Sequence, residues 1–312
     1  MILDSPNEQK VSLSGGSGFL GRAIAAAIHR RGMRVLRLVR GEANSSDELR
    51  WDPAAGQMLD AGRMEGISAA VHLSGANVAA RRWTAAYKRE MVESRIGTTR
   101  VLSEALARLK QPPEVLLTAS AVGIYGDRRD EILDEDSEAG VGFFPELCSA
   151  WEAATRSAED AGIRVVHVRF GMVIGRDGGA MARLAPIFRL GLGGRLGDGR
   201  QWMSWVSEAD AVSAVLFALG VSDGGEIELS GPVNVVAPEP VTNAGFTRDL
   251  GRALHRPAVL PAPTFALRLA FGEMADAALL ASTRAVPKRL LDAGFVFAHP
   301  TLREALAAAL AS

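Results

Sequence analysis

The sequence predicts an α/β protein with a doubly wound parallel sheet of the Rossmann type and a smaller, mostly helical C-terminal domain on the substrate side. Three observations support this. The chain opens with a strand that runs into a glycine-rich turn and a helix. Short apolar runs then alternate with longer amphipathic ones as far as about Leu219, and the segment after three closely spaced prolines is mostly helical. Strands that alternate with helices are typical of a parallel sheet covered on both faces.

The first predicted strand is VSLSGG, and GFLGRAIAAAIHRRG follows it as a helix. Its apolar residues recur at helical spacing, and Gly32 is placed to end it. The next predicted strands are RVLRLV, AAVHLSG, EVLLTAS and IRVVHVRFG, with helices expected around residues 84–109 and 145–161. We therefore expect a flexible N-terminus over 1–9 and a Rossmann domain over 10–228, with a substrate-side insertion at about 176–204.

Residues 229–312 are expected to form the C-terminal domain. GPVNVV predicts a strand, VTNAGFTRDLGRAL predicts a helix, and HRPAVLPAPT marks a boundary with its three prolines. The last helix has a start signal, because Thr301 can cap it and Glu304 stands three residues further on. GEMADAALLAS carries an apolar stripe that needs a partner surface, made of Met274, Ala277, Ala278 and Ala281. We expect this tail to cover the substrate side of the cleft.

Composition excludes several classes of protein. Hydrophobic residues make up 48% and charged residues 23%, and the net charge is -1, so the chain has no positive excess for binding nucleic acid or an anionic membrane. The opening MILDSPNEQK lacks the basic start and apolar stretch of a signal peptide. The single cysteine, Cys148, excludes an internal disulfide and fits a reducing compartment. We expect a cytoplasmic monomer or homodimer with a small-molecule substrate and neither a nucleic-acid nor a membrane partner.

The run SGGSGFLG predicts a dinucleotide site. It places glycines in a GxxGxxG pattern between a strand and a helix, where a side chain would block approach to a pyrophosphate and the helix start offers free N–H groups. The alternative is a tight turn without a ligand. The cofactor contacts expected in this run are Gly15, Ser17, Gly18, Phe19 and Leu20.

The end of the second strand favours NADP(H). An NAD site usually has a carboxylate there to bind the ribose hydroxyls, but this chain has Val39 and Arg40, and no carboxylate before Glu42. An arginine can pair with the 2′-phosphate that a carboxylate would repel. The alternative for Arg40 is a solvated loop residue.

Several motifs together resemble a known family. SGGSGFLG, SAVGIYG, VRFGMVIG and GDGRQWMSWVSEAD are similar to those of extended short-chain dehydrogenases/reductases, which include the NAD(P)-dependent epimerases and dehydratases of sugar nucleotides. WDP with Gly56, HLSGANV, RRWTAAYKREMVESRIGTTR and GEMADAALLAS resemble, more narrowly, epimerase-family proteins of uncertain substrate with a short helical C-terminal domain. The resemblance implies cofactor contacts at Leu73, Ser74 and Gly75, and Asn77 could hydrogen-bond into the same cleft.

The resemblance also exposes a departure from the family pattern. Such proteins carry Tyr-x-x-x-Lys on a helix and a serine or threonine at a neighbouring strand end, where the tyrosine moves a proton while the nicotinamide moves a hydride. Counted from Glu152, the tyrosine position is Phe144 and the lysine position is Cys148. The serine position is Ala121, with Ser120 beside it.

Substitutes for the missing pair are few. The candidate catalytic residues are Ser120, Tyr125 and Cys148, although Tyr125 could instead pack against substrate and Cys148 could belong to the core. A basic cluster over 81–95 is either a solvated helix face or a phosphate-binding surface, and with the later tryptophans it supplies the substrate-side candidates Lys88, Arg95 and Trp202. No cluster has metal-ligand spacing, so we expect no metal site.

Two functions remain open on this reading. The first is an NADP(H)-dependent epimerase or oxidoreductase that acts on an unidentified, possibly nucleotide-linked substrate through a degenerate Tyr-Lys site. The alternative is a catalytically weak or inactive NADP(H)-binding protein with a regulatory or sensing role.

Overall fold

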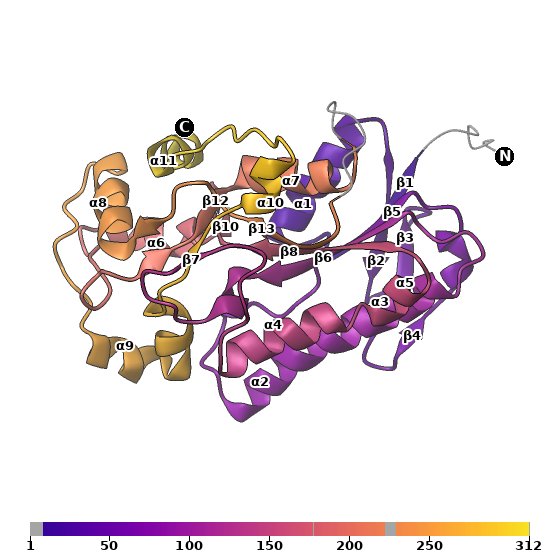
Figure 1. Ribbon diagram of the computed structural model, residues 1–312, viewed down its shortest axis with the longest axis horizontal. Coiled ribbons are helices and arrows are strands. Elements are labelled where there is room, and N and C mark those ends of the chain that lie inside the picture. The colour runs from indigo at the N-terminus through magenta and orange to yellow at the C-terminus, as the bar shows by residue number, and fades with distance from the viewer. Residues whose placement is uncertain (1–8, 177, 222–228, 312) are drawn as a thin grey trace.

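A computed structural model describes residues 9–176, 178–221 and 229–311 of the chain (Figure 1). The flexible N-terminus expected over 1–9 lies outside these residues, except for Gln9. The centre of the molecule is an eight-stranded sheet of order β13-β8-β6-β5-β1-β2-β3-β4. Neighbouring strands are parallel except β3 and β4 at one edge, and the order runs outward from β1 in both directions. The predicted doubly wound fold is confirmed.

The elements have the following bounds. The strands of the large sheet are β1 Lys10–Ser14, β2 Arg34–Val39, β3 Glu48–Asp52, β4 Gln57–Met58, β5 Ala69–His72, β6 Val115–Ala121, β8 Arg164–Phe170 and β13 Gly231–Val235. The shorter strands are β7 Ile132–Leu133, β9 Met172–Gly175, β10 Gly178–Gly179, β11 Trp202–Met203, β12 Trp205–Ser207, β14 Val241–Thr242 and β15 Arg284–Ala285. The α-helices are α1 Phe19–Arg30, α2 Ala85–Val92, α3 Thr98–Ala107, α4 Phe143–Ala153, α5 Arg156–Asp160, α6 Met181–Arg189, α7 Glu208–Ala218, α8 Asn243–Ala253, α9 Thr264–Phe271, α10 Lys288–Asp292 and α11 Leu302–Leu310. Short 3-10 or π turns lie at η1 Ala61–Met64, η2 Glu93–Gly97, η3 Val122–Tyr125 and η4 Ala275–Leu279.

Helices cover both faces of the sheet, with α1, α7 and α10 on one side and α2, α3, α4 and α5 on the other (Figure 1). Successive strand residues point to opposite faces, and two apolar clusters result. Leu13 of β1 joins Ile24 of α1 and Val215 of α7 in the first cluster. Leu36 of β2 joins Leu102 and Leu106 of α3 in the second. Burial of each such side chain contributes roughly 1.5–3 kcal/mol, so the sheet and its helices form a rigid base for the loops at the strand ends.

Three elements differ from the sequence-based expectation. The strand β3 was not predicted, because ELRWD is short, half polar and placed at the side of the sheet beyond β2. The helix expected over 84–109 is present but is interrupted by the π turn η2 between α2 and α3. The helix expected over 145–161 is divided into α4 and α5.

The C-terminal region is not separated from the sheet at residue 228. The strand β13 lies beyond that boundary and pairs with β8, and Leu290 and Phe295 belong to the first core cluster. A second lobe gathers α6, α8 and α11 around Trp205, whose side chain is fully buried. The expected capping box at Thr301 and Glu304 is present at the start of α11.

The apolar stripe expected in GEMADAALLAS is only partly formed. Met274 is buried and Ala277 is partly buried against Trp83 and Leu147, so this segment packs against the α2 and α4 side of the cleft. Ala278 is exposed. The segment adopts a π turn at Ala275–Leu279, which changes the angular spacing on which the stripe depends. No helix within the described ranges is long and apolar enough to cross a membrane.

Candidate cofactor and active site

The glycine-rich turn after β1 packs so closely on neighbouring backbone that a side chain would not fit at Gly15 or Gly21. Gly15 has φ +72°, and a Cβ there would lie 2.8 Å from the carbonyl carbon and oxygen of Leu73. A Cβ on Gly21 would lie 2.2 Å from the Gly15 oxygen, so the first turn of α1 packs directly on the loop. The Gly18 N–H donates to the Gly15 carbonyl over 3.0 Å, and Gly18 begins the helix without a side-chain cap. The helix start therefore keeps backbone N–H groups for an anion, which fits the pyrophosphate of a dinucleotide.

Arg40 directly follows β2 and its side chain is exposed. Its neighbour Arg37 is already paired with Glu48 over 2.9 Å, and the other Glu48 oxygen accepts from the Asn44 N–H. The Glu48 carboxylate is thus engaged in holding the loop after β2. Arg40 remains positioned to meet a 2′-phosphate, and its contact with NADP(H) stays a prediction.

The loop after β5, over residues 73–77, runs beside the glycine turn. Leu73 donates to the Ser14 carbonyl, and its own carbonyl faces Gly15. His72 at the strand end is fully buried between Ser14 Oγ at 2.6 Å and Thr98 Oγ1 at 3.2 Å, and burial lowers its pKa to about 3. His72 is therefore neutral at physiological pH and orders the strand end rather than moving protons. The Asn77 side chain accepts from the Ala79 N–H and so shapes its own loop.

Helix α4 keeps its expected apolar face. Leu147 and Trp151 are buried one turn apart. The Phe144 ring packs against Gly123 so closely that a Cβ there would lie 2.3 Å from a ring carbon, and it lies 5.5 Å from the Trp83 ring. The tyrosine position is thus a fixed apolar wall. Its proximity to the nicotinamide remains a prediction.

Cys148 is buried completely at the lysine position of α4. Burial raises the pKa of its thiol to about 12, and the Glu152 carboxylate adds to the effect. A thiol with this pKa stays protonated at neutral pH and neither donates a proton readily nor acts as a nucleophile. The structure does not support a catalytic role for Cys148.

Tyr125 is also buried completely, and its hydroxyl already has two partners. It donates to Asn234 Oδ1 over 2.8 Å and accepts from Arg169 Nη1 over 2.9 Å. Burial raises the pKa of this hydroxyl despite the adjacent guanidinium. Because this fully buried hydroxyl is already bonded to two residues of the chain, the structure argues against both a proton-transfer role and contact with substrate.

Ser120 belongs to the same buried polar chain. Its hydroxyl donates to Glu152 Oε1 over 2.6 Å, and that carboxylate accepts two further bonds from Arg169 at 2.8 and 2.9 Å. The pair is almost wholly buried, with side-chain exposures of 8% for Arg169 and 13% for Glu152. The sequence analysis did not predict this pair. The arginine inside the apolar strand VVHVRF was the signal, since a buried arginine requires a partner.

The substrate-side candidates do not converge. Lys88 pairs with Glu273 and lies 4.5 Å from the centre of the Phe143 ring, beside Trp83 and Phe144. Trp202 has other neighbours, because its indole donates to Asp130 over 2.8 Å and stacks under Arg284 at 4.2 Å. Arg95 lies under the loop after β5, where Nη2 donates to the Ala76 carbonyl over 2.8 Å. Lys88 thus links helix α2, which covers the sheet, to the C-terminal region through Glu273.

Comparison with protein-family models matches most of the chain. Residues 11–230 match the NAD dependent epimerase/dehydratase family, and residues 262–309 match a domain of unknown function, DUF1731. The chain belongs to the NAD-dependent epimerase/dehydratase family. Its resemblance to that family in sequence is thereby confirmed.

Relatives of this epimerase-family chain span nearly its whole length. The epimerase family protein Mb2239 of Mycobacterium bovis is 46% identical over 296 residues, which covers 95% of this chain and 96% of that protein. The human epimerase family protein SDR39U1 is 35% identical, with coverage of 95% and 98%. A crystal structure of human SDR39U1 with NADPH matches with a TM-score of 0.86 at 34% identity, over 96% of this chain and 98% of that one. A nucleoside-diphosphate sugar epimerase from Corynebacterium glutamicum matches with a TM-score of 0.78 at 33% identity, over 97% and 58%.

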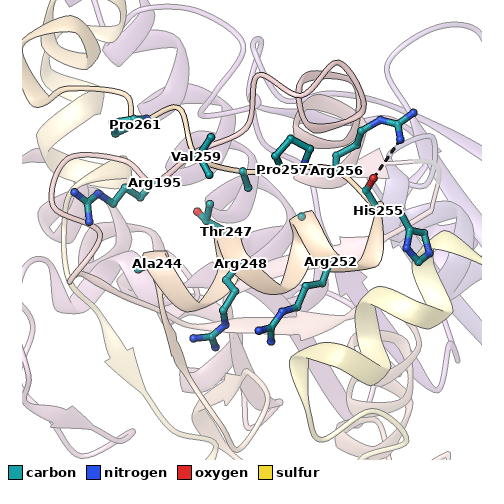
Figure 2. Close-up of a pocket in the computed structure, with 12 residues that line it drawn as sticks. Arg195, Ala244, Thr247, Arg248, Arg252, His255, Arg256, Pro257, Val259 and Pro261 are labelled. Carbon is teal, nitrogen blue, oxygen red and sulfur yellow. Dashed lines mark hydrogen bonds between the residues drawn. The ribbon is translucent and has the colours of Figure 1, made fainter.

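A separate groove of about 800 Å³ lies in the C-terminal lobe of this family member, between α8 and residues 255–261 (Figure 2). Its lining is basic and includes Arg195, Arg248, Arg252, His255 and Arg256. Figure 2 shows Arg248 and Arg252 projecting from α8 on the same side, with Arg195 and Arg256 placed apart from them, and Asp249 pairs with both Arg248 and Arg252. None of the predicted cofactor residues is among the residues that line this groove. It is a positively charged surface rather than an assembled site.

Within the described part of the chain, no three His, Cys, Asp or Glu side chains are grouped so that they could hold a metal ion. His167 is engaged with Thr118 at 3.1 Å, and burial lowers its pKa.

Proposed function

We propose that this protein binds NADP(H) as a retained ligand and carries out ordinary carbonyl reduction or epimerisation slowly or not at all. One observation carries the proposal: the backbone cradle for a dinucleotide is complete, while the acid–base positions on α4 hold Phe144 and buried Cys148. A bound nicotinamide supplies or accepts hydride. General acid–base catalysis typically adds 10²–10⁴-fold, and neither Phe144 nor Cys148 can provide it.

The preference for NADP(H) over NAD(H) rests on Arg40 at the end of β2 and on the engagement of Glu48 by the neighbouring loop. The NADPH in the structure of human SDR39U1, which is 34% identical, supports the same cofactor for this chain. The function that follows is regulatory or sensing, in which occupancy by NADP(H) is the signal.

A second candidate is an NADP(H)-dependent oxidoreductase or epimerase that acts on a nucleotide-linked or other polar substrate. It is favoured by the contacts that hold the C-terminal lobe over the α2 side: the Lys88–Glu273 pair, and the bond from Arg183 to the Ala79 carbonyl. A protein that only retains its cofactor does not require a lobe at that place. In this case the proton would come from substrate or water.

The test is to measure NADPH and NADH binding by fluorescence titration, and then NADPH oxidation across a panel of carbonyl compounds and nucleotide sugars. We expect tight NADPH binding and oxidation near the background rate. Rapid turnover with any member of the panel would favour the second candidate. Absence of NADPH binding would overturn both.

A further inference from the structure

Arg95 is a buried cation without a counterion. Its side chain is 6% exposed, and no described Asp or Glu comes within salt-bridge distance of it. Among the residues that the structure describes, its guanidinium donates to the carbonyls of Ala76 at 2.8 Å and Met91 at 3.3 Å, and the buried Nε has no partner there. Burial lowers the pKa of Arg95. Such a group is costly for a protein to keep, which makes it a candidate for function.

The helical backbone is distorted at Arg95. Arg95 lies in the π turn η2, where one additional residue interrupts the otherwise continuous helix from α2 to α3. Single π turns often occur at functional sites. Ser94 accepts from the Ala76 N–H over 3.0 Å while Arg95 binds the Ala76 carbonyl, so the two residues fix the loop after β5. The turn thereby points Arg95 beneath that loop.

The position of Arg95 relative to the sheet identifies which half of a dinucleotide it faces. The strand order reverses at β1, so Arg40 at β2 lies on one side of the glycine turn and β5, β6 and β8 lie on the other. A dinucleotide bound with its 2′-phosphate at Arg40 and its pyrophosphate at α1 therefore extends its nicotinamide half toward β5 and β6. Arg95 contacts the loop after β5 and stacks on Trp151 of α4, at 5.0 Å from the ring. It is also close enough to influence the Cys148 thiol electrostatically.

We propose that Arg95 supplies, from a different helix, the positive charge that Cys148 does not supply at the lysine position, and that it thereby positions the nicotinamide-side ribose and phosphate of NADP(H). Arg95 is a positioning residue in this scheme. It approaches the same region beside α4 from the π turn η2. The inference rests on the proposed binding of NADP(H) and adds the residue that holds the second half of the ligand.

A purely structural role makes a different prediction. If Arg95 only held the Ala76 carbonyl, a neutral side chain with an N–H donor would serve nearly as well. If the charge acts on the ligand, a neutral side chain fails and a lysine succeeds. Arg95→Gln and Arg95→Lys separate these two roles.

The binding experiment uses the full-length protein and two probes. NADPH reports on the whole site, and 2′,5′-ADP reports on the adenosine half alone. We expect Arg95→Gln to weaken NADPH by about 10- to 100-fold, as for the loss of a charge-assisted contact, and to leave 2′,5′-ADP unchanged. Arg95→Lys should stay within a few-fold of the wild type for both probes. Arg100→Gln, an exposed residue of α3, is the control and should change neither.

Moving the positive charge from residue 95 to residue 148 gives a second test, which stays informative even when a variant is partly destabilised. Cys148→Lys alone places a second cation beside Arg95 and should lower both the unfolding temperature and the NADPH affinity. Combined with Arg95→Gln, the same lysine should restore most of the NADPH affinity that Arg95→Gln loses. Unfolding temperatures without ligand would be recorded for every variant.

Three results would overturn the inference: unchanged NADPH affinity in Arg95→Gln, equal losses for NADPH and 2′,5′-ADP, or no recovery in the double variant. If the wild type bound neither probe, the proposed function itself would be wrong. Failure of the two ideas is therefore distinguishable.

Discussion

The β1 end and the β6 end of the cleft are built in opposite ways. At β1, the absence of side chains at Gly15 and Gly21 lets the glycine turn pack on the Leu73 backbone and lets the first turn of α1 pack on the glycine turn. At β6, Phe144, Cys148 and Tyr125 fill the space, and a buried Glu152–Arg169 pair engages the polar groups. Cofactor binding depends on backbone shape, whereas proton transfer depends on the identity of a few side chains. The second property can therefore be lost while the first is kept, which is the arrangement that we propose for this protein.

The β6 end should be the more sensitive to a single change in charge. Glu152→Ala leaves Arg169 buried without its carboxylate, which should lower the free energy of unfolding by about 3–5 kcal/mol. Denaturant titration measures this. Glu273→Ala, which removes a surface partner of Lys88, is the control and should cost at most about 1 kcal/mol. Replacing both Glu152 and Arg169 by methionine should recover part of the loss, and a double variant as unstable as Glu152→Ala would contradict this account of the pair.

The β1 end should be the more sensitive to added volume. Gly15→Ala combines a positive φ with contact against the Leu73 carbonyl, so we expect a loss of about 2–4 kcal/mol in stability and a parallel loss of NADPH affinity. Gly32→Ala is a matched control, because Gly32 also has positive φ but nothing within 4 Å of its Cβ. It should cost about 1–2 kcal/mol and leave NADPH binding intact. Equal effects at the two positions would show that backbone strain, not close approach, makes Gly15 necessary.

The preference between NADPH and NADH tests the β1 end further, at Arg40 after the neighbouring strand β2. Arg40→Ala should weaken NADPH by about 1.5–3 kcal/mol and leave NADH almost unchanged, because only NADPH carries the 2′-phosphate. Arg37 lies three residues before Arg40 and is paired with Glu48, so Arg37→Ala controls for a general loss of positive charge. Equal affinities of the wild-type protein for NADPH and NADH would refute the assignment of Arg40.

The smallest effects are expected at the candidate catalytic residues. Cys148→Ser and Tyr125→Phe should not change the rate of NADPH oxidation. The pKa of Cys148 is raised from 9.0 to about 12, so the thiol stays protonated as pH rises through 9 and ionises only as pH approaches 12. Alkylation by iodoacetamide in the native protein should therefore remain slow up to pH 9, while the unfolded protein reacts. Fast labelling of Cys148 at pH 8, or a lower oxidation rate in either variant, would support a catalytic role for the residue concerned.

Sequence reasoning was strongest where the structural cause is local. The glycines of SGGSGFLG lie between a strand and a helix, and the spacing of Thr301 and Glu304 defines a capping box, so both could be read within a few residues. The partners of Arg169 and Tyr125 could not, because Glu152, Asn234 and the two residues meet only after β6, β8, β13 and α4 assemble. The π turn that buries Arg95 also has no local signature. The arrangement of the candidate catalytic residues therefore depends on long-range polar contacts, which the sequence does not reveal.

The strand order also determines how the chain can assemble during synthesis. Among the strands of the large sheet, the central β1 is synthesised first, β2, β3 and β4 then extend the sheet on one side, and β5, β6 and β8 follow on the other. The strand β13 is synthesised only after α6, and α8 and α11, which complete the packing around Trp205, follow later still. Until then the apolar surface around Trp205 and Phe246 stays open to solvent or to a chaperone. Because domains fold largely in the order of their synthesis, the nucleotide-binding half can form its cradle before the lobe that closes beside it exists.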